Sequence, residues 1–66
     1  MADAIVSEKI HADRKIFFLD LKENDRGRFL KITEDVNGRR DTIMVPESAF
    51  KDFAEAFLRV TEYEGH

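Results

Sequence analysis

Residues 22–32 read KENDRGRFLKI and predict the tip of a β-hairpin, from which the other strands can be placed. The residues in it that favour a turn are Asn24, Asp25 and Gly27. They separate two apolar runs, residues 17–21 and 29–33. The cations on the tip and the adjoining strands are Lys22, Arg26, Arg28 and Lys31. Together with Phe29 they indicate a surface for single-stranded nucleic acid, because cations attract phosphates and a flat ring stacks on a base.

The composition limits what the chain can be. It has 66 residues, no cysteine and a net charge of −3. This length predicts one small domain with a marginal core, and the lack of cysteine fits a reducing compartment. The acidic balance argues mildly against a nucleic-acid binder. However, the cations concentrate in residues 14–40, and the local field matters more than the total charge.

Targeting signals are not evident. The N-terminus, Met1-Ala2-Asp3, lacks the cationic start and the apolar run of a signal peptide. No stretch approaches the roughly 20 apolar residues of a membrane span. We therefore expect a cytoplasmic protein with no membrane partner.

The loop at residues 24–27 predicts the register of the middle hairpin. With an even loop, the cross-strand pairs are Leu21 with Leu30, Leu19 with Ile32, Lys22 with Phe29, and Asp20 with Lys31. Apolar residues then share one face, while the other face carries a cation beside a ring and an Asp20–Lys31 ion pair. An odd loop would mix the two faces, so the even register is favoured.

A second turn gives an independent prediction. Asn37-Gly38 tolerates the positive φ of a type I′ turn and is the strongest hairpin signal in the chain. The pairs it predicts are Ile32 with Ile43, Leu30 with Val45, Thr33 with Thr42, and Lys31 with Met44. Both turns therefore predict one inner face, formed by Leu19, Leu21, Leu30, Ile32, Ile43 and Val45.

The remaining segments complete an α+β fold, a four-stranded antiparallel sheet followed by one C-terminal helix. A first strand over residues 4–10, an Ala12-Asp13 turn and a second strand over residues 14–23 would set Val6 opposite Leu19. Pro46 ends the fourth strand.

The helix begins after Pro46, with Ser48, or alternatively Glu47, as its N-cap and Asp52 in its first turn. Its apolar stripe consists of Phe50, Phe53, Ala54, Phe57, Leu58 and Val60. We expect this stripe to form core or dimer contacts and the helix to cover the inner face. The outer face would still expose Ile16, Phe18, Phe29 and Met44. Such a patch is typical of a binding surface or a subunit contact.

Nothing in the sequence indicates catalysis. His11 and His66 lack metal-ligand spacing, and Asp20 and Glu34 lie on different strand faces. No nucleophile has a base at motif spacing, and there is no phosphate-binding glycine loop. We expect no enzyme activity, no catalytic or metal-binding residue, no cofactor and no small-molecule substrate.

Part of the chain resembles a known repeat. Residues 19–24, LDLKEN, and 26–32, RGRFLKI, are similar to the PUR repeat of the Pur-alpha-like purine-rich-element binding proteins and their bacterial relatives. The similarity extends from about Val6 to Val60, and residues 1–66 are interpreted as one repeat. The resemblance implies a ββββα repeat and a homodimer in which two repeats intertwine with their helices packed together. A one-repeat chain resembles a bacterial member, for which we expect association with the nucleoid.

The resemblance also implies a function. It implies binding of single-stranded DNA and RNA, a preference for purine-rich or G-rich sequence, and a capacity to separate strands. The family's Lys-x-Asn-x-Arg motif falls on Lys22, Asn24 and Arg26, and its base-stacking phenylalanine falls on Phe29. Lys31 is a further candidate for a phosphate contact. The alternative function is a protein-interaction module that uses the apolar sheet face.

Other residues near these candidates have weaker assignments. Arg28 is expected at the rim of the inner face, opposite Glu23. Phe18 either stacks a base or fills the dimer seam, and the seam is favoured. Arg39 and Arg40 flank a turn and are expected to be solvated.

Overall fold

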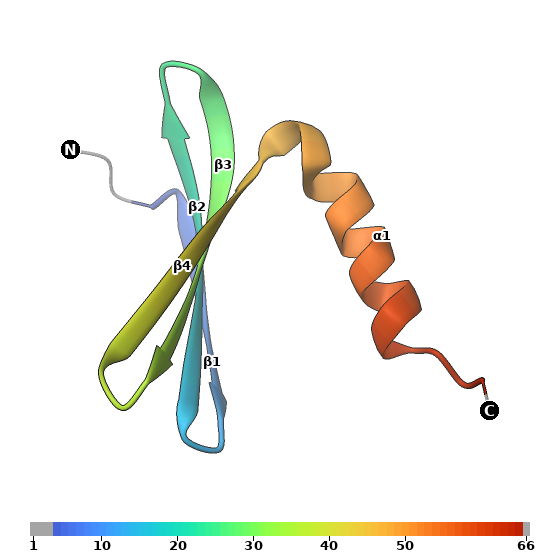
Figure 1. The fold of residues 1–66 in the computed structure, drawn as a ribbon. Coiled ribbons are helices and arrows are strands. Elements are labelled where there is room, and N and C mark those ends of the chain that lie inside the picture. Colours follow the sequence, from blue (N-terminus) through green and yellow to red (C-terminus); the bar gives the residue numbers. More distant parts are fainter. Residues whose placement is uncertain (1–3, 66) are drawn as a thin grey trace.

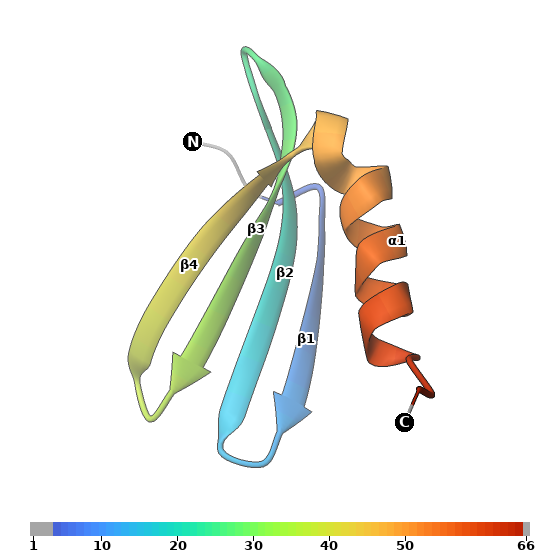
Figure 2. The same cartoon turned by 45° about the vertical axis from the view of Figure 1, so that its right-hand side comes forward.

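The computed structural model describes residues 4–65, which form a four-stranded antiparallel sheet followed by a short 3₁₀ turn and one helix (Figure 1). The elements are β1 (Val6–Ala12), β2 (Lys15–Asn24), β3 (Gly27–Val36), β4 (Arg39–Pro46), η1 (Glu47–Ala49) and α1 (Phe50–Thr61). The strands lie side by side in chain order, with β1 and β4 at the two edges (Figure 2). This confirms the predicted fold class. Residues 1–3 and His66 of the predicted repeat lie outside the described residues.

The registers predicted for the two C-terminal hairpins are confirmed. All pairs expected between β2 and β3 and between β3 and β4 are present, including Lys22 opposite Phe29 and Ile32 opposite Ile43. The Asn37-Gly38 turn has φ values of 55° and 87°, in the left-handed region that these two residue types tolerate. A slip by one residue would turn the apolar residues to the other face, so the hydrophobic pattern and the turn select the same register.

The first hairpin differs from the prediction. Its two turn residues are Asp13 and Arg14, so Val6 pairs with Leu21 and not with Leu19. Asp13 has a φ of 58°, which aspartate tolerates and alanine does not, and the turn is therefore centred one residue beyond the expected Ala12-Asp13 position. The register moves by two residues, an even number, so each β1 residue keeps its predicted face.

The inner face of the sheet is apolar but only partly covered. Val45 is buried, with 5% of its surface exposed, whereas Ile43 is 56% exposed and Val6 54%. Charged side chains also lie on this face: Glu8 is opposite Leu19 near its middle, and Lys15 Nζ is 2.9 Å from Glu34 Oε2 toward one end. Within residues 4–65, the buried side chains are those of Val45 and, on the opposite face, Thr33. One chain therefore leaves most of its apolar face half-buried or exposed.

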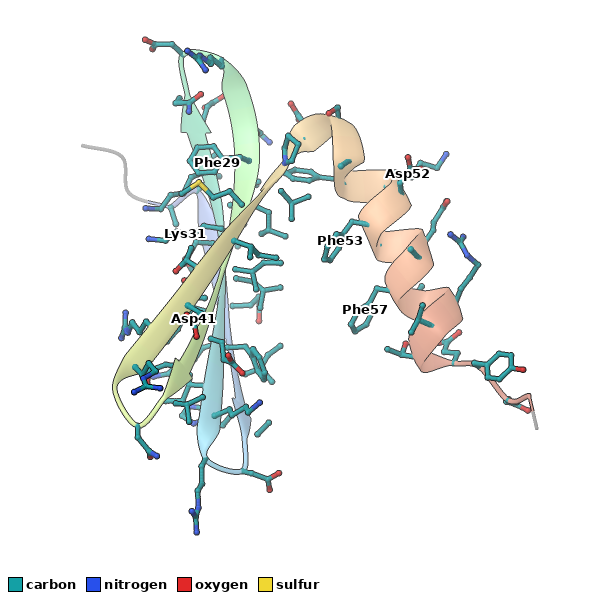
Figure 3. All side chains as sticks on the ribbon, viewed as in Figure 1. Phe29, Lys31, Asp41, Asp52, Phe53 and Phe57 are labelled. Carbon is teal, nitrogen blue, oxygen red and sulfur yellow. The ribbon has the colours of Figure 1, made fainter. Side chains whose placement is uncertain are left out.

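The helix does not cover this face. In the described part of the chain α1 has no buried residue, and its main contact is with η1 and not with any strand. Figure 3 shows Phe53 and Phe57 on the side of the helix that faces the sheet, yet the two side chains are 43% and 58% exposed. The expectation that the helix packs on its own sheet is therefore wrong. After the three residues of η1 the chain turns back, and α1 runs alongside the sheet but stands apart from it (Figures 1 and 2).

The predicted N-cap is also wrong. Ser48 lies inside η1, and α1 has Ala49 at its N-cap position, with no side-chain hydrogen bond there from Ser48 or Glu47. Pro46 ends β4 in an extended conformation, as expected, but the 3₁₀ turn that follows draws Ser48 into helical backbone. Asp52 does occupy the first turn of α1, where a carboxylate stabilises the positive end of the helix dipole.

Candidate nucleic-acid interface

The outer face of the sheet carries the residues predicted to bind nucleic acid. Because side chains alternate along a strand, Lys22 on β2 and Phe29 and Lys31 on β3 share this face. Phe29 lies directly opposite Lys22 on one side and Pro46 on the other, and Lys31 lies opposite Met44. Figure 3 shows Phe29 and Lys31 on the side of the sheet away from the helix.

The side chain of Asn24 stabilises the turn at the hairpin tip. The backbone N–H of Arg26 donates to Asn24 Oδ1 at 2.8 Å, which closes the turn, and Gly27 follows with a φ of 123°. This hydrogen bond uses the amide oxygen of Asn24 and leaves its NH₂ group as a donor. Arg26 is exposed and has no ion pair within the described residues. The tip therefore presents an amide donor and a cation side by side.

A shallow hollow of about 260 Å³ lies below the tip. Its lining consists of Asn24, Arg26, Gly27, Arg28, Phe29, Met44 and Pro46. It therefore brings together three of the five predicted site residues, namely Asn24, Arg26 and Phe29. Lys22 and Lys31 are not part of the lining but flank Phe29, across the strands and along β3 respectively.

Met44 and Pro46 were not predicted as site residues. Met44 was expected on the outer face, and the signal for both was available in the register, which places Pro46 opposite Phe29 and Met44 opposite Lys31. Arg28 also touches the hollow, but its Nε lies 3.8 Å from Glu23 Oε2 at the rim, the partner predicted for it.

The predicted Asp20–Lys31 ion pair does not form. The two residues are cross-strand partners, but Asp20 accepts a hydrogen bond from the hydroxyl of Ser7 on β1. The ion pairs among the described residues are Lys15–Glu34, Arg28–Glu23 and Arg40–Asp35. Because Ser7 is the direct neighbour of Asp20 on the other side, the carboxylate is satisfied without Lys31, and the Lys31 ammonium has no carboxylate partner among these residues.

Among the described residues, the aromatic ring that makes cation–π contacts is that of Phe18 and not that of Phe29. Lys9 Nζ lies 5.6 Å and Arg40 Cζ 5.1 Å from the centre of the Phe18 ring. Arg40 is therefore not simply solvated, contrary to expectation. The cation–π contact expected between Lys22 and Phe29 is not formed, although the two residues are paired.

Asp35 holds Arg40 in this position. Arg40 Nε donates to Asp35 Oδ2 at 2.8 Å, and the backbone N–H of Gly38 donates to Asp35 Oδ1 at 2.9 Å. The hydrogen bond from Gly38, and secondly the one from Arg40, lower the pKa of Asp35 below its usual value. The carboxylate therefore stays ionised at neutral pH and fixes the guanidinium above the sheet.

Other classes of site find little support in the described residues. No three His, Cys, Asp or Glu side chains in them are arranged to hold a metal ion. Among the elements described, there is no helix with the length and apolar character needed to cross a membrane. His66, one of the two histidines considered above, lies outside the described residues.

The comparisons with known proteins agree with this architecture. The chain belongs to the family described as PurA ssDNA and RNA-binding protein, whose family model matches residues 1–65. This confirms the resemblance to the PUR repeat.

Individual relatives show the same similarity. The chain is 42% identical over 62 residues to transcription factor Pur-alpha 1 of Arabidopsis thaliana, which covers 94% of this chain and 21% of that protein. It is 41% identical over 70 residues to transcriptional activator plp-1 of Caenorhabditis elegans, with 94% and 30% covered. It is 32% identical over 69 residues to human transcriptional activator protein Pur-alpha, with 94% and 21% covered. The chain therefore spans less than a third of the length of these relatives.

Proposed function

We propose that the chain binds single-stranded DNA and RNA on the outer face of its sheet, with Phe29 and the hairpin tip at the centre of the site. The observation that carries this proposal is the hollow beside Phe29, because Asn24 and Arg26 lie at its rim and Lys22 and Lys31 flank the ring. An aromatic surface surrounded by cations is what a base and its phosphates require. Membership of the family supports the same class of ligand.

The five residues have three kinds of role in the proposal. Phe29 stacks on a base, and Lys22, Arg26 and Lys31 contact the phosphates on either side. Asn24 donates from its NH₂ group to a base edge or a phosphate, since its oxygen is already engaged by the Arg26 backbone. No residue in this arrangement is assigned a catalytic role, and no cofactor is required.

A preference for purine-rich sequence is part of the proposal. Met44 and Pro46 extend the apolar surface beyond the Phe29 ring, so a larger purine covers more of it than a pyrimidine does. An apolar ring inserted between bases also opposes their re-pairing, which supports a capacity to separate strands.

We further propose that the protein is a homodimer, with residues 1–66 as one of two intertwined repeats. The apolar stripe of α1 and the inner face of the sheet are both left open by one chain, as Phe57 and Ile43 show. A second copy of the chain would cover both at once, and twofold pairing is the commonest closed symmetry. We place the protein in the cytoplasm, associated with the nucleoid if the source is bacterial.

The test is a titration of labelled single strands. Purine-rich and pyrimidine-rich DNA and RNA of matched length are titrated at two salt concentrations, with a duplex of the same sequence as control. We expect binding that weakens with salt and is stronger for the purine-rich strands. A protein that binds none of the single strands would contradict the proposal and favour a protein-interaction module.

A further inference from the structure

Phe18 lies on the outer face, farther from the hairpin tip than Phe29. It is paired with Thr33 on β3, four residues along that strand from Phe29. At about 3.3 Å per residue, the two rings are roughly 13 Å apart along the sheet. Phe18 thus belongs to the same face as the proposed site but lies outside the hollow at the tip.

Cations from two other strands contact this ring. Lys9 comes from β1 and Arg40 from β4, and both place their charge within 6 Å of the ring centre. A cation on each side of an aromatic ring is the combination that the tip was expected to have. Here the contacts are actually formed.

The cluster is also held in place. Arg40 is bound by Asp35 through Nε alone, so the two NH₂ groups of its guanidinium stay available as donors. A guanidinium that rests on a ring presents its other face to a base and its edge to a phosphate. Lys9 has no carboxylate partner among the described residues.

The charge of the whole outer face favours an anionic occupant. Its cations are Lys9, Lys22, Lys31 and Arg40, and its carboxylates are Asp20 and Asp35. Both carboxylates already accept hydrogen bonds from the chain, Asp20 from Ser7 and Asp35 from Gly38 and Arg40. An excess of cations beside two separate rings fits a polyanion that carries flat groups at intervals.

We propose that Phe18, Lys9 and Arg40 form a second nucleic-acid contact, so that a single strand runs from the hairpin tip along the outer face to Phe18. This rests on the proposed function and extends the site beyond the tip. At about 3.4 Å per stacked nucleotide, the distance between the two rings corresponds to about four steps along the strand. In the bound state Lys9 holds a phosphate, and Arg40, stacked on Phe18, holds a base or the next phosphate.

The test compares strand lengths. The variants Lys9→Gln and Arg40→Gln are titrated with a strand of about 12 nucleotides, which spans both contacts, and with one of about three nucleotides, which is too short to do so. Arg39→Gln is the matched control, because Arg39 neighbours Arg40 on the same strand but faces the inner side. Thermal melting of each variant confirms that it is folded, and Lys9→Gln removes no ion pair among the described residues.

For the long strand, each of the two variants should flatten the log–log salt dependence of binding by about 0.7. The affinity lost between about 50 and 200 mM salt should then shrink by about 2.6-fold per variant. For the short strand the salt dependence should stay that of the parent, and Arg39→Gln should leave both unchanged.

Three other outcomes would contradict the second contact or the proposed function, and the measurements distinguish between them. If the parent binds single strands and both variants keep the parental salt dependence on the long strand, the second contact is refuted while the proposed function stands. If the variants instead dissociate a dimer, as seen by light scattering, with that dependence unchanged, Phe18 belongs to a subunit contact and the inference is wrong. If the parent binds neither strand, the proposed function fails as well.

Discussion

The outer and inner faces of the same sheet leave different kinds of side chain uncovered. The outer face combines half-buried rings with cations, and its carboxylates are engaged by neighbouring groups of the chain. The inner face carries mainly apolar side chains, and it remains half open because the chain's own helix does not pack on it. Charged groups keep their solvation when exposed, whereas exposed aliphatic surface costs free energy until something apolar covers it. The two faces therefore fit the two different partners proposed above, a polyanion on the outer face and a second copy of the chain on the inner face.

The largest effect should come from removing a side chain of the inner layer. Phe57→Ala is expected to lower the free energy of unfolding by about 3 kcal/mol, because the proposed dimer buries the ring against a second copy. In a single chain the ring is 58% exposed, and the same change would cost less than about 0.5 kcal/mol. Denaturant unfolding at fixed protein concentration distinguishes the two cases.

This variant has two controls, a substitution at an exposed residue and a measurement of the mass of the parent protein. Tyr63→Ala, at an exposed position after the helix, should leave the unfolding free energy nearly unchanged. Light scattering of the parent at micromolar concentration should give twice the chain mass of 7.7 kDa. A stably folded monomer would remove the reason to assign a partner to the inner face.

A change beside the hairpin tip, on the outer face, should affect binding and not stability. Phe29→Ala is expected to weaken single-strand affinity by about 5- to 150-fold, which corresponds to about 1–3 kcal/mol of lost stacking. The melting temperature should change little, because the ring is half-buried on the outer face and is not in the inner layer. Affinity and melting are measured on the same preparation.

The matched control is Phe29→Tyr, which keeps the flat ring and should keep most of the affinity. Should Phe29→Ala unfold the protein, the ring would be part of a structural contact. A folded variant that binds as tightly as the parent would show that the ring does not stack on a base.

Smaller changes are expected at the hairpin tip. Lys22→Ala and Arg26→Ala should each flatten the salt dependence of binding by about 0.7 in log–log units if each side chain neutralises one phosphate. Neither side chain has an ion pair among the described residues, so stability should be preserved. If the salt dependence stays unchanged in both variants, the phosphate backbone of the nucleic acid does not contact the tip.

The smallest effect concerns Asp35 at the far end of the outer face. Its pKa is lowered in the folded protein, mainly by the Gly38 N–H and then by Arg40, so the ionised form stabilises the fold. This contribution is present above the usual pKa of an unfolded aspartate and is lost as the pH falls through the lower folded pKa. Asp35→Asn should remove this part of the acid sensitivity. The measurement is the melting temperature of parent and variant at a series of pH values, and parallel curves would contradict the assignment.

Local patterns in the sequence determined most of the sheet. Alternation of apolar and polar residues separates the two faces, and the Asn37-Gly38 turn sets the register because few residue pairs accept its backbone angles. The positions of Lys22, Phe29 and Lys31 on the outer face followed from these rules, since both act over a few neighbouring residues. The turn signal at Ala12-Asp13 is weaker, and there the predicted turn was misplaced by one residue. The face on which each β1 residue lies was still predicted correctly.

The tertiary structure decided which groups meet within that frame. Asp20 has a cross-strand partner on each side, Ser7 and Lys31, and its carboxylate accepts a hydrogen bond from Ser7 and forms no ion pair with Lys31. Arg40 reaches across β3 to the Phe18 ring, a contact that no spacing along the chain specifies. The helix was expected on the inner face because its stripe is apolar, but in the single chain it stands apart from the strands and has its main contact with η1. The periodicity of apolar residues in the sequence predicts which surface must be buried. The path of the chain determines whether the same molecule can bury it.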